Sequence, residues 1–375
     1  MPYLQRPGAR LFFDVVGEGP NTIITTHGLT HCGAYWSRTG VSEALAEAGF
    51  RVADLDLRGH GRSAPLSGED PGYTVDHIAA DIGALADHLG AEQFHLLNHA
   101  TGGMAGLRFA MDHHDRLLSL VSSDTGSATA PSDKFSDPDY EGSYPPPFDT
   151  PFDNPAVAEL EEFSVREIIQ RARQGDGRPF QLGFATNEDP ERCWRWLEDI
   201  RSTSHPGQVA DFGRHFFNDL DPKIEGLKQI DCPNFVLIGE LDVMFRKPAE
   251  LLARHLPQVE YQVVPGRGHT LAIEDPNAGQ GNGGEHTRSE PDNPSQISAL
   301  MTTDEDGNPL LTPREIEVVD LVLKGHSSDS IAALLGMTPG TVKVHRRNIY
   351  RKLHIRSQAE LFAWFVANSG VAKGE

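Results

Sequence analysis

Basic side chains gather in one short stretch near the C-terminal end of the sequence. Residues 339–353 have helical spacing that places Val342, Ile349 and Leu353 on one apolar face and most basic groups elsewhere. Guanidinium and ammonium groups on one helix can bind phosphates and base edges in the DNA major groove. An ordinary solvated basic face is the alternative interpretation. The basic residues of the stretch are Lys343, His345, Arg346, Arg347, Arg351 and Lys352.

The sequence around this stretch predicts further helices, over 313–323, 328–335 and 358–367. Thr312 and Pro313 are typical of a helix start, and Glu315 completes a capping box. The second helix ends at Gly336, and Thr338 is expected to cap the helix over 339–353. Two helices joined by a tight turn that contains glycine are the geometry of a helix-turn-helix.

Three motifs in this segment, LTPRE, SSDSIAALLGMTPGTVKVHRRNIYRKL and SQAELFAW, resemble the DNA-binding domain of LuxR-type regulators. The resemblance spans the whole segment and implies double-stranded DNA as a partner. It also implies a homodimer formed through the helix over 358–367, on two half-sites about one helical turn apart. The implied contacts are with base edges for Lys343, Val344 and Arg347, and nearer the DNA backbone for Thr341, Arg346 and Arg351.

Four motifs in the first 275 residues resemble the α/β-hydrolase fold: THGLTHCGAYW, DLDLRGHGRSA, LIGELDVMFRKP and PGRGHTLAIEDP. The resemblance implies that the backbone N–H of Leu29 is placed to bind a carbonyl oxygen. It also implies that Asp242 takes the position of the family's acid and His269 that of its general base. In this family the strand-to-helix turn that carries the nucleophile, called the elbow, comes first in the chain, followed by the acid and then the histidine. The same order is present here.

A fifth motif, FHLLNHATGGMAG, occupies the place of the strand-to-helix turn that carries the nucleophile in this family. Alignment on His99 and Gly102 puts Ala100 at the nucleophile position, and Asn98 replaces the first glycine. A methyl group cannot attack a carbonyl, because acyl transfer needs an activated Ser, Cys or Asp there. We therefore expect a degenerate triad of Ala100, Asp242 and His269, and no enzyme activity.

The groups that remain predict a site for a small-molecule effector. Backbone N–H groups of Leu29 and Thr101, beside the His269 imidazole, would hold a carbonyl or lactone oxygen without breaking a bond. Ala100 and Trp194 complete the expected pocket, which would suit a small, apolar carbonyl, ester or lactone compound.

Several residues of this segment have more than one interpretation. Asp242 and His269 could be relics held only by packing. Asp124 is expected to cap the next segment, with a displaced acid as the alternative. His27 and His31 have metal-ligand spacing, but we interpret both as structural because no HExxH or comparable cluster accompanies them. The sequence therefore predicts no metal and no cofactor, and its three cysteines are expected to be buried, reduced thiols.

Alternating β-branched runs and helical patterns predict a doubly wound, mainly parallel sheet in residues 1–275. Strands are expected over 22–27, 51–56, 94–98, 117–123, 234–239 and 260–264. The pattern breaks over 126–226, which indicates an inserted helical lid. Residues 276–308 are rich in Gly, Pro and Asn and predict a flexible linker. Residues 309–375 then form a small, all-α helix-turn-helix domain.

The net charge of −21 argues against a nucleic-acid partner for the chain as a whole. The charge is unevenly divided, because residues 308–375 carry nine Lys and Arg against six Asp and Glu. Such asymmetry is typical of a separate nucleic-acid-binding module. No apolar run approaches the roughly 18 residues of a membrane helix, and the first residues lack a secretory signal pattern. We expect a cytoplasmic protein without a membrane partner.

Three functions fit these observations. The leading hypothesis is a ligand-responsive DNA-binding transcription regulator with a non-hydrolysing sensor domain. The second is a working esterase or lactonase with a regulatory DNA-binding tail, in which a water activated by His269 replaces the nucleophile, since Ser63 and Ser122 do not occupy the elbow. The third is a constitutive DNA-binding protein whose larger domain is an inert scaffold.

Overall fold

The computed structural model describes residues 2–129, 155–174, 179–185, 187–219, 221–242, 244–275, 311–323, 331–332, 335–353 and 355. Among these residues, every helix is too short or too polar to cross a lipid bilayer. The predicted linker over 276–308 and the predicted helix over 358–367 lie outside the described residues, and the predicted helix over 328–335 lies mostly outside them.

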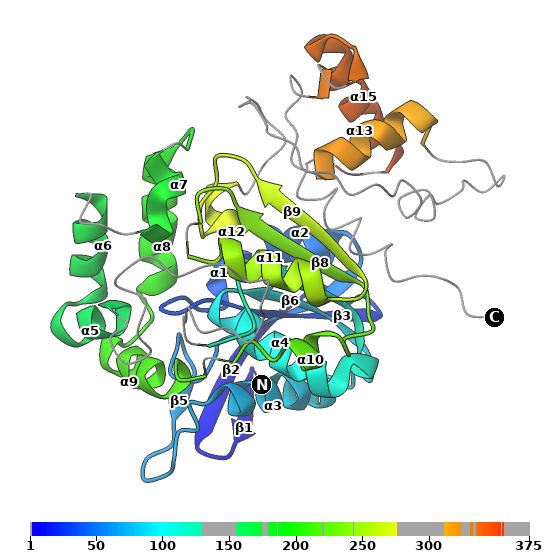
Figure 1. Ribbon diagram of the computed structural model, residues 1–375. Coiled ribbons are helices and arrows are strands. Elements are labelled where there is room, and N and C mark those ends of the chain that lie inside the picture. The colour runs from blue at the N-terminus through cyan, green and yellow to red at the C-terminus, as the bar shows by residue number, and fades with distance from the viewer. Residues whose placement is uncertain are drawn as a thin grey trace.

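A twisted sheet forms the centre of the larger domain, with the order β1-β2-β4-β3-β6-β7-β8-β9 and with β5 paired to β2 (Figure 1). Neighbours from β4 to β9 are parallel, whereas β2 runs antiparallel to β1, β4 and β5. The predicted α/β fold with a mainly parallel sheet is confirmed. The strands are β1 Tyr3–Arg6, β2 Ala9–Val16, β3 Asn21–Thr26, β4 Phe50–Leu55, β5 Ala64–Pro65, β6 Phe94–His99, β7 Leu117–Ser123, β8 Asn234–Gly239 and β9 Val259–Val264.

Both faces of the sheet are buried, because alternate residues of each central strand enter different cores. In β3, Ile23 packs with α1 (Ala34–Ser37), α2 (Val41–Glu47) and α8 (Pro190–Arg201). Its neighbour Ile24 packs on the other side, with α3 (Val75–His88), α4 (Thr101–His113) and α11 (Arg246–His255). This two-sided burial explains why the central strands have nearly continuous apolar sequences.

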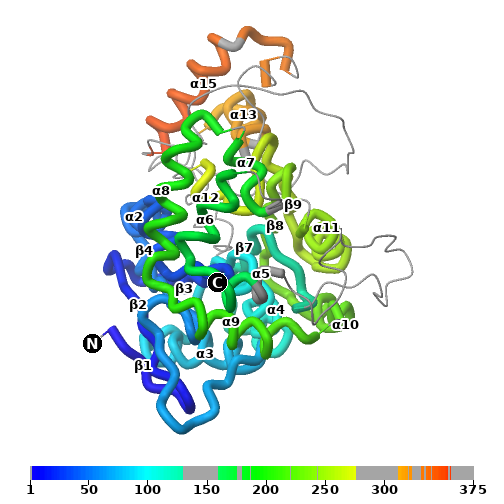
Figure 2. The backbone as a smooth tube through the Cα atoms, turned by 90° about the vertical axis from the view of Figure 1, so that its left-hand side faces the viewer, coloured from blue at the N-terminus to red at the C-terminus, as the bar shows by residue number. Residues whose placement is uncertain are grey.

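Most of the described part of the insertion over 126–226 is helical, as predicted. Figures 1 and 2 show its helices gathered at one side of the sheet. Ser164 and Glu167 form a complete capping box at α6, and Asp189 caps α8 through the Arg192 N–H. The helices are α5 Pro155–Glu162, α6 Val165–Arg173, α7 Leu182–Ala185, α8 and α9 Pro206–Phe216, with the 3₁₀ turn Pro179–Gln181 before α7. Short helices α10 (Ile224–Leu227) and α12 (Leu271–Glu274) follow, and a 3₁₀ turn (His114–Arg116) precedes β7.

The C-terminal segment has its own apolar core, which joins α13 (Pro313–Leu323) to α15 (Pro339–Lys352). The expected capping box is present, since the Thr312 N–H donates to Glu315 Oε2 at 2.8 Å and the Glu315 N–H to Thr312 Oγ1 at 3.3 Å. Thr338 caps α15 by accepting the Thr341 N–H at 3.2 Å. The predicted starts of both helices are confirmed.

Candidate functional site

A sharp turn joins β6 to α4, with Ala100 between His99 and Thr101. Ala100 has φ 48° and ψ −118°, a conformation that costs strain energy in a residue with a Cβ atom. Glycines let the helix approach the sheet, since a Cβ at Gly102 would lie 2.3 Å from Thr26 Oγ1. Asn98 has room at this turn because it faces Gly106. A Cβ atom added at Gly106 would lie only 2.4 Å from the Asn98 amide. The turn therefore keeps a strained elbow geometry around an alanine.

His269 and Asp242 meet at the carboxyl ends of β8 and β9. His269 Nδ1 lies 2.8 Å from Asp242 Oδ2, and both side chains are buried. The other carboxylate oxygen, Oδ1, accepts the N–H groups of Met244 and Phe245, each at 3.1 Å. With the Nδ1 proton held by the carboxylate, His269 Nε2 becomes the basic atom of the ring. The structure thus brings together the two residues that the sequence assigned as acid and base.

Asp124 follows β7 directly and has φ 52°, and its carboxyl group lies within 4.8 Å of this pair. Its Oδ1 accepts the Gly239 N–H at 3.0 Å and its Oδ2 accepts the Ser123 hydroxyl at 2.6 Å. Burial, followed by repulsion from Asp242, raises the pKa of Asp124 well above its ordinary value. The expectation that Asp124 caps the next segment is wrong, because its carboxyl group ties β7 to β8.

Aromatic rings that the sequence did not assign to the site surround His269. Phe180 precedes α7 and Phe245 precedes α11, and their ring centroids lie 4.9 and 5.0 Å from that of His269. The His99 ring lies 5.0 Å away and stacks on Tyr35 at 4.4 Å. Burial lowers the pKa of His99 well below its ordinary value, so this ring is neutral. Phe245 had one sequence signal, its place three residues after Asp242.

Trp194 contacts other parts of the lid. Its ring meets Phe184 edge to face at 4.8 Å, and the Arg173 guanidinium lies 5.8 Å from the ring centroid. The ring contacts recorded among the described residues connect His269 with Phe180, Phe245 and His99 and not with Trp194.

The loop after β3 brings Leu29 to the elbow. Its N–H donates to the Thr101 hydroxyl at 3.1 Å, while the N–H of Thr101, the first amide of α4, has no acceptor among the described residues. Gly28 lies against the turn, because an added Cβ would be 3.1 Å from Ala100 Cβ. The two backbone donors expected at this site are therefore adjacent, but one of them is already hydrogen-bonded.

His27 holds this loop in place. Its Nδ1 lies 2.9 Å from the Gly28 carbonyl oxygen, and its Nε2 accepts the Leu57 N–H at 3.0 Å. Both ring nitrogens of His27 are thus used within the protein, which supports a structural role. His31 stacks on Tyr35, with ring centroids 5.1 Å apart.

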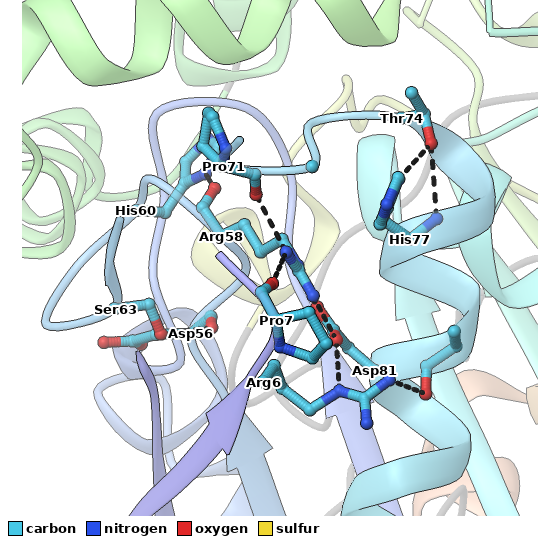
Figure 3. Close-up of polar contacts among 12 residues, drawn as sticks. Arg6, Pro7, Asp56, Arg58, His60, Ser63, Pro71, Thr74, His77 and Asp81 are labelled. Carbon is cyan, nitrogen blue, oxygen red and sulfur yellow. Dashed lines mark hydrogen bonds and ion pairs between the residues drawn. The ribbon is translucent and has the colours of Figure 1, made fainter. Parts of the chain in front are cut away.

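The Arg-Gly-His-Gly loop after β4 is held by a buried ion pair (Figure 3). The Arg58 guanidinium is 1% exposed and binds both carboxylate oxygens of Asp81, at 2.6 and 2.9 Å. It also donates to the carbonyl oxygens of Pro7 and Pro71, each at 2.8 Å. His60 Nδ1 lies 2.9 Å from the Arg58 carbonyl oxygen, so the same network orients the His60 ring.

Among the described residues, Asp124, Asp242 and His269 form a group of three whose ligand-type atoms all lie within 4.8 Å of one another. Both carboxyl groups already accept hydrogen bonds from protein donors, and His269 Nδ1 already pairs with Asp242. Hydrogen bonds within the protein therefore explain why these three side chains lie close together.

The second candidate site is the surface of α15. Thr341, Lys343, Arg347 and Arg351 are exposed, and Val344 is 44% exposed, which is unusual for a large apolar side chain. Lys352 is half-buried and pairs with Glu315 at 2.6 Å.

Arg346 differs from the other predicted DNA-contacting residues. It is only 8% exposed, and it donates to the Tyr350 hydroxyl at 3.1 Å. Arg346 follows Val342 by one helical turn, so it shares the buried side of α15. The structure therefore does not bring Arg346 together with the exposed residues of the predicted DNA-binding surface.

Comparison with known proteins identifies both domains. A family model described as alpha/beta hydrolase fold matches residues 21–276, and one described as bacterial regulatory proteins, luxR family, matches residues 309–365. The enol-lactonase from Burkholderia xenovorans LB400 shares the fold, with a TM-score of 0.57 and 19% identity over 73% of this chain and 94% of that structure.

Two curated relatives match parts of the larger domain. A putative 2-succinyl-6-hydroxy-2,4-cyclohexadiene-1-carboxylate synthase of Bacillus subtilis is 25% identical over 283 residues, which are 70% of this chain and 90% of the relative. A putative carbamate hydrolase, RutD, of Caulobacter vibrioides is 39% identical over 103 residues, which span 28% of this chain and only 36% of the relative. The chain belongs to the α/β-hydrolase fold family and carries, in its C-terminal segment, a DNA-binding domain of the luxR family of bacterial regulatory proteins.

Proposed function

We propose that this chain is a ligand-responsive transcription regulator whose hydrolase-fold domain binds a small carbonyl, ester or lactone compound without hydrolysing it. The observation that carries the proposal is the methyl group of Ala100 at the strained turn between β6 and α4. A methyl group has neither a lone pair for attack nor a proton for His269 to remove. The domain thus keeps the geometry of a carbonyl-binding site and lacks the reacting oxygen.

The proposed ligand site lies between the elbow and His269. The free N–H of Thr101 and Nε2 of His269 supply polar contacts, and Leu29 closes the side formed by the loop after β3. Ala100, Phe180 and Phe245 supply apolar surface, which is the usual composition of small-molecule sites. Trp194 stays a prediction as a ligand contact.

The proposed DNA-binding surface is the exposed side of α15. Lys343, Val344 and Arg347 face base edges in the major groove, with Thr341 and Arg351 nearer the phosphates. We assign Arg346 to the packing of the domain. A homodimer formed through the helix over 358–367 would place two copies of α15 on the two half-sites.

Ligand binding regulates DNA binding only if the ligand prefers one of two states of the protein. We propose that the ligand changes dimer contacts, or releases an interface that masks α15. Electrostatic masking fits the charge distribution, because the hydrolase-fold domain is strongly acidic and the exposed side of α15 is basic. DNA affinity measured with and without ligand across salt concentrations tests this, since salt screens such masking.

A second candidate function is hydrolysis by a water molecule that His269 activates. The intact 2.8 Å contact between His269 and Asp242 favours it, because the pair retains the arrangement of a general base and its orienting acid. A curated relative described as a putative carbamate hydrolase matches part of this domain, and a carbamate is a carbonyl compound, the class that this site would also take.

A DNA-shift assay tests the proposal directly. The full chain is mixed with DNA from upstream of its neighbouring genes, with and without each of a panel of esters and lactones, and compounds are first screened by thermal shift. We expect at least one compound to raise Tm and to change DNA affinity at least tenfold.

Two variants serve as controls for this assay. Phe245→Ala should lose the response to the compound and keep DNA binding, whereas Lys343→Ala should lose DNA binding and keep the thermal shift. Stable DNA binding that no stabilising compound changes would contradict ligand regulation, and steady release of a hydrolysis product would support the second candidate function.

A further inference from the structure

The Thr101 hydroxyl accepts a hydrogen bond from one of the two backbone N–H donors at the turn between β6 and α4, which we call the elbow site. Leu29 N–H donates to Thr101 Oγ1 at 3.1 Å, across two segments that are far apart in the sequence. Thr101 is 3% exposed, and Leu29 is half-buried against the larger core. Because the adjacent N–H of Thr101 itself has no acceptor among the described residues, one donor of the pair is taken and the other is available.

We propose that the Thr101 hydroxyl is a second barrier to acyl transfer, so that catalysis is prevented at residue 101 as well as at residue 100. This inference rests on the proposed function, in which the native domain does not hydrolyse its ligand. Thr101 is then a residue that determines specificity. One backbone N–H holds the carbonyl oxygen of a bound ligand, whereas the carbonyl oxygen of a reacting ester would be held by two.

The physical reason is the charge that develops during acyl transfer. A hydroxyl at residue 100 would attack the carbonyl carbon, its proton would pass to His269 Nε2, and the carbonyl oxygen would become an oxyanion. Collapse of this intermediate returns the electron pair to the carbonyl, and the leaving alcohol takes the proton from His269; water then releases the acid by the same steps. The oxyanion needs preorganised donors, and removal of one typically lowers kcat by about 10²–10³-fold.

Rotation of Thr101 does not easily clear the site. The residue lies in the first turn of α4, where a β-branched side chain has few allowed rotamers. One of the two other staggered rotamers about the Cα–Cβ bond places the methyl group toward Leu29 and so still covers its N–H. Removal of the whole side chain beyond Cβ therefore frees the Leu29 N–H more completely than an isosteric change to Val.

The test compares four variants of the full chain with p-nitrophenyl butyrate as substrate: Thr101→Ala, Ala100→Ser, Ala100→Ser/Thr101→Ala and Ala100→Ser/Thr101→Ser. We expect the variant Ala100→Ser/Thr101→Ala to exceed Ala100→Ser in kcat by about 10²-fold, with KM changed less than about threefold. The matched control Ala100→Ser/Thr101→Ser keeps the blocking hydroxyl and should behave like Ala100→Ser. Thr101→Ala alone should have no turnover, because residue 100 remains Ala.

Covalent labelling provides a second measurement. Mass spectrometry after reaction with a fluorophosphonate should show faster adduct formation for Ala100→Ser/Thr101→Ala than for Ala100→Ser, and thermal melting should show that each variant is folded. Equal rates for these two variants would overturn the role of Thr101, as would folded variants that all stay inactive. Turnover by the native chain would instead overturn the proposed function, so the two failures are distinguishable.

Discussion

The rings of His60 and Phe212 meet edge to face, with their centroids 4.8 Å apart. His60 belongs to the loop after β4, and Phe212 to the lid helix α9. The His60 ring also lies 5.3 Å from the ring of His27, which holds the loop that carries Leu29. A continuous set of packed rings therefore joins the lid to one of the two backbone donors of the candidate site.

Phe212 is expected to contribute strongly to stability, because its side chain is fully buried between the lid and the loop after β4. Phe212→Ala should lower the free energy of unfolding by about 3–5 kcal/mol, since truncation leaves a cavity. Phe212→Leu fills more of the space and should cost less. Urea unfolding of both variants measures these values, and a loss below about 1 kcal/mol for Phe212→Ala would mean that this contact does not secure the lid.

The buried pair of Arg58 and Asp81 gives a second prediction. Asp81→Asn should lower the free energy of unfolding by about 3–5 kcal/mol, because it leaves the Arg58 guanidinium buried without its charge partner. Asp87→Asn is the matched control: Asp87 pairs with Arg116 at 2.9 Å but its side chain is 70% exposed. That change should cost less than about 1 kcal/mol. Equal losses of unfolding free energy in the two variants would show that burial does not increase the contribution of the Arg58–Asp81 pair to stability.

The pH dependence of stability can be tested at His95, which lies outside the candidate site. Burial lowers the pKa of His95 to about 4, below the roughly 6.5 of an unfolded chain. The unfolded chain then binds the proton more tightly, so stability supplied by neutral His95 is complete above about pH 6.5 and is lost towards pH 4. Relative to His95→Gln, the native chain should lose about 1.4 kcal/mol per pH unit in this window.

At Asp54 we expect the opposite dependence of stability on pH. Burial raises the pKa of Asp54 to about 7, above the roughly 3.9 of an unfolded chain. The unfolded chain therefore loses its proton first, and the native chain should gain stability relative to Asp54→Asn as the pH falls from 7 to 4. Chemical denaturation at several pH values measures both differences in the free energy of unfolding. The assigned pKa shifts would be contradicted if the free energy of unfolding of the native chain changed with pH in the same way as that of the variants.

The positions of side chains on α15 predict different effects on DNA binding. Lys343→Ala and Arg347→Ala should each weaken binding to a specific site by about 1–3 kcal/mol. Arg346→Met should change DNA affinity little, since Arg346 is buried against Tyr350, although it can lower the stability of the domain. Fluorescence anisotropy with a labelled duplex, combined with thermal melting, separates the two effects. A tenfold loss of affinity in a stably folded Arg346→Met protein would place Arg346 in the interface.

The fold could be predicted from the sequence wherever its signals were local. Buried parallel strands have continuous apolar runs, so β7 and β8 were located to the residue, and the capping residues Thr312 and Thr338 fixed the starts of α13 and α15. The strands β1, β2 and β5 were missed. They form the antiparallel edge of the sheet, where exposed residues interrupt the apolar pattern.

The candidate site was predictable only in part. The elbow, Asp242 and His269 follow strand ends, so the sequence order already brings them to one edge of the sheet. Phe180 and Phe245 were not assigned, because their approach to His269 depends on how the lid folds. The hydrogen bond between Leu29 and Thr101 likewise depends on a single side-chain torsion, for which the sequence carries no signal.

Recovery of the bound compound shows whether the domain holds a carbonyl compound without breaking it. Native protein is incubated with a stabilising ester or lactone for many dissociation half-lives, and both components are then analysed by mass spectrometry. We expect an unchanged compound, no product in excess of a protein-free control, and a polypeptide of unaltered mass. Product that accumulates beyond one equivalent, or an acyl adduct on the polypeptide, would contradict this expectation.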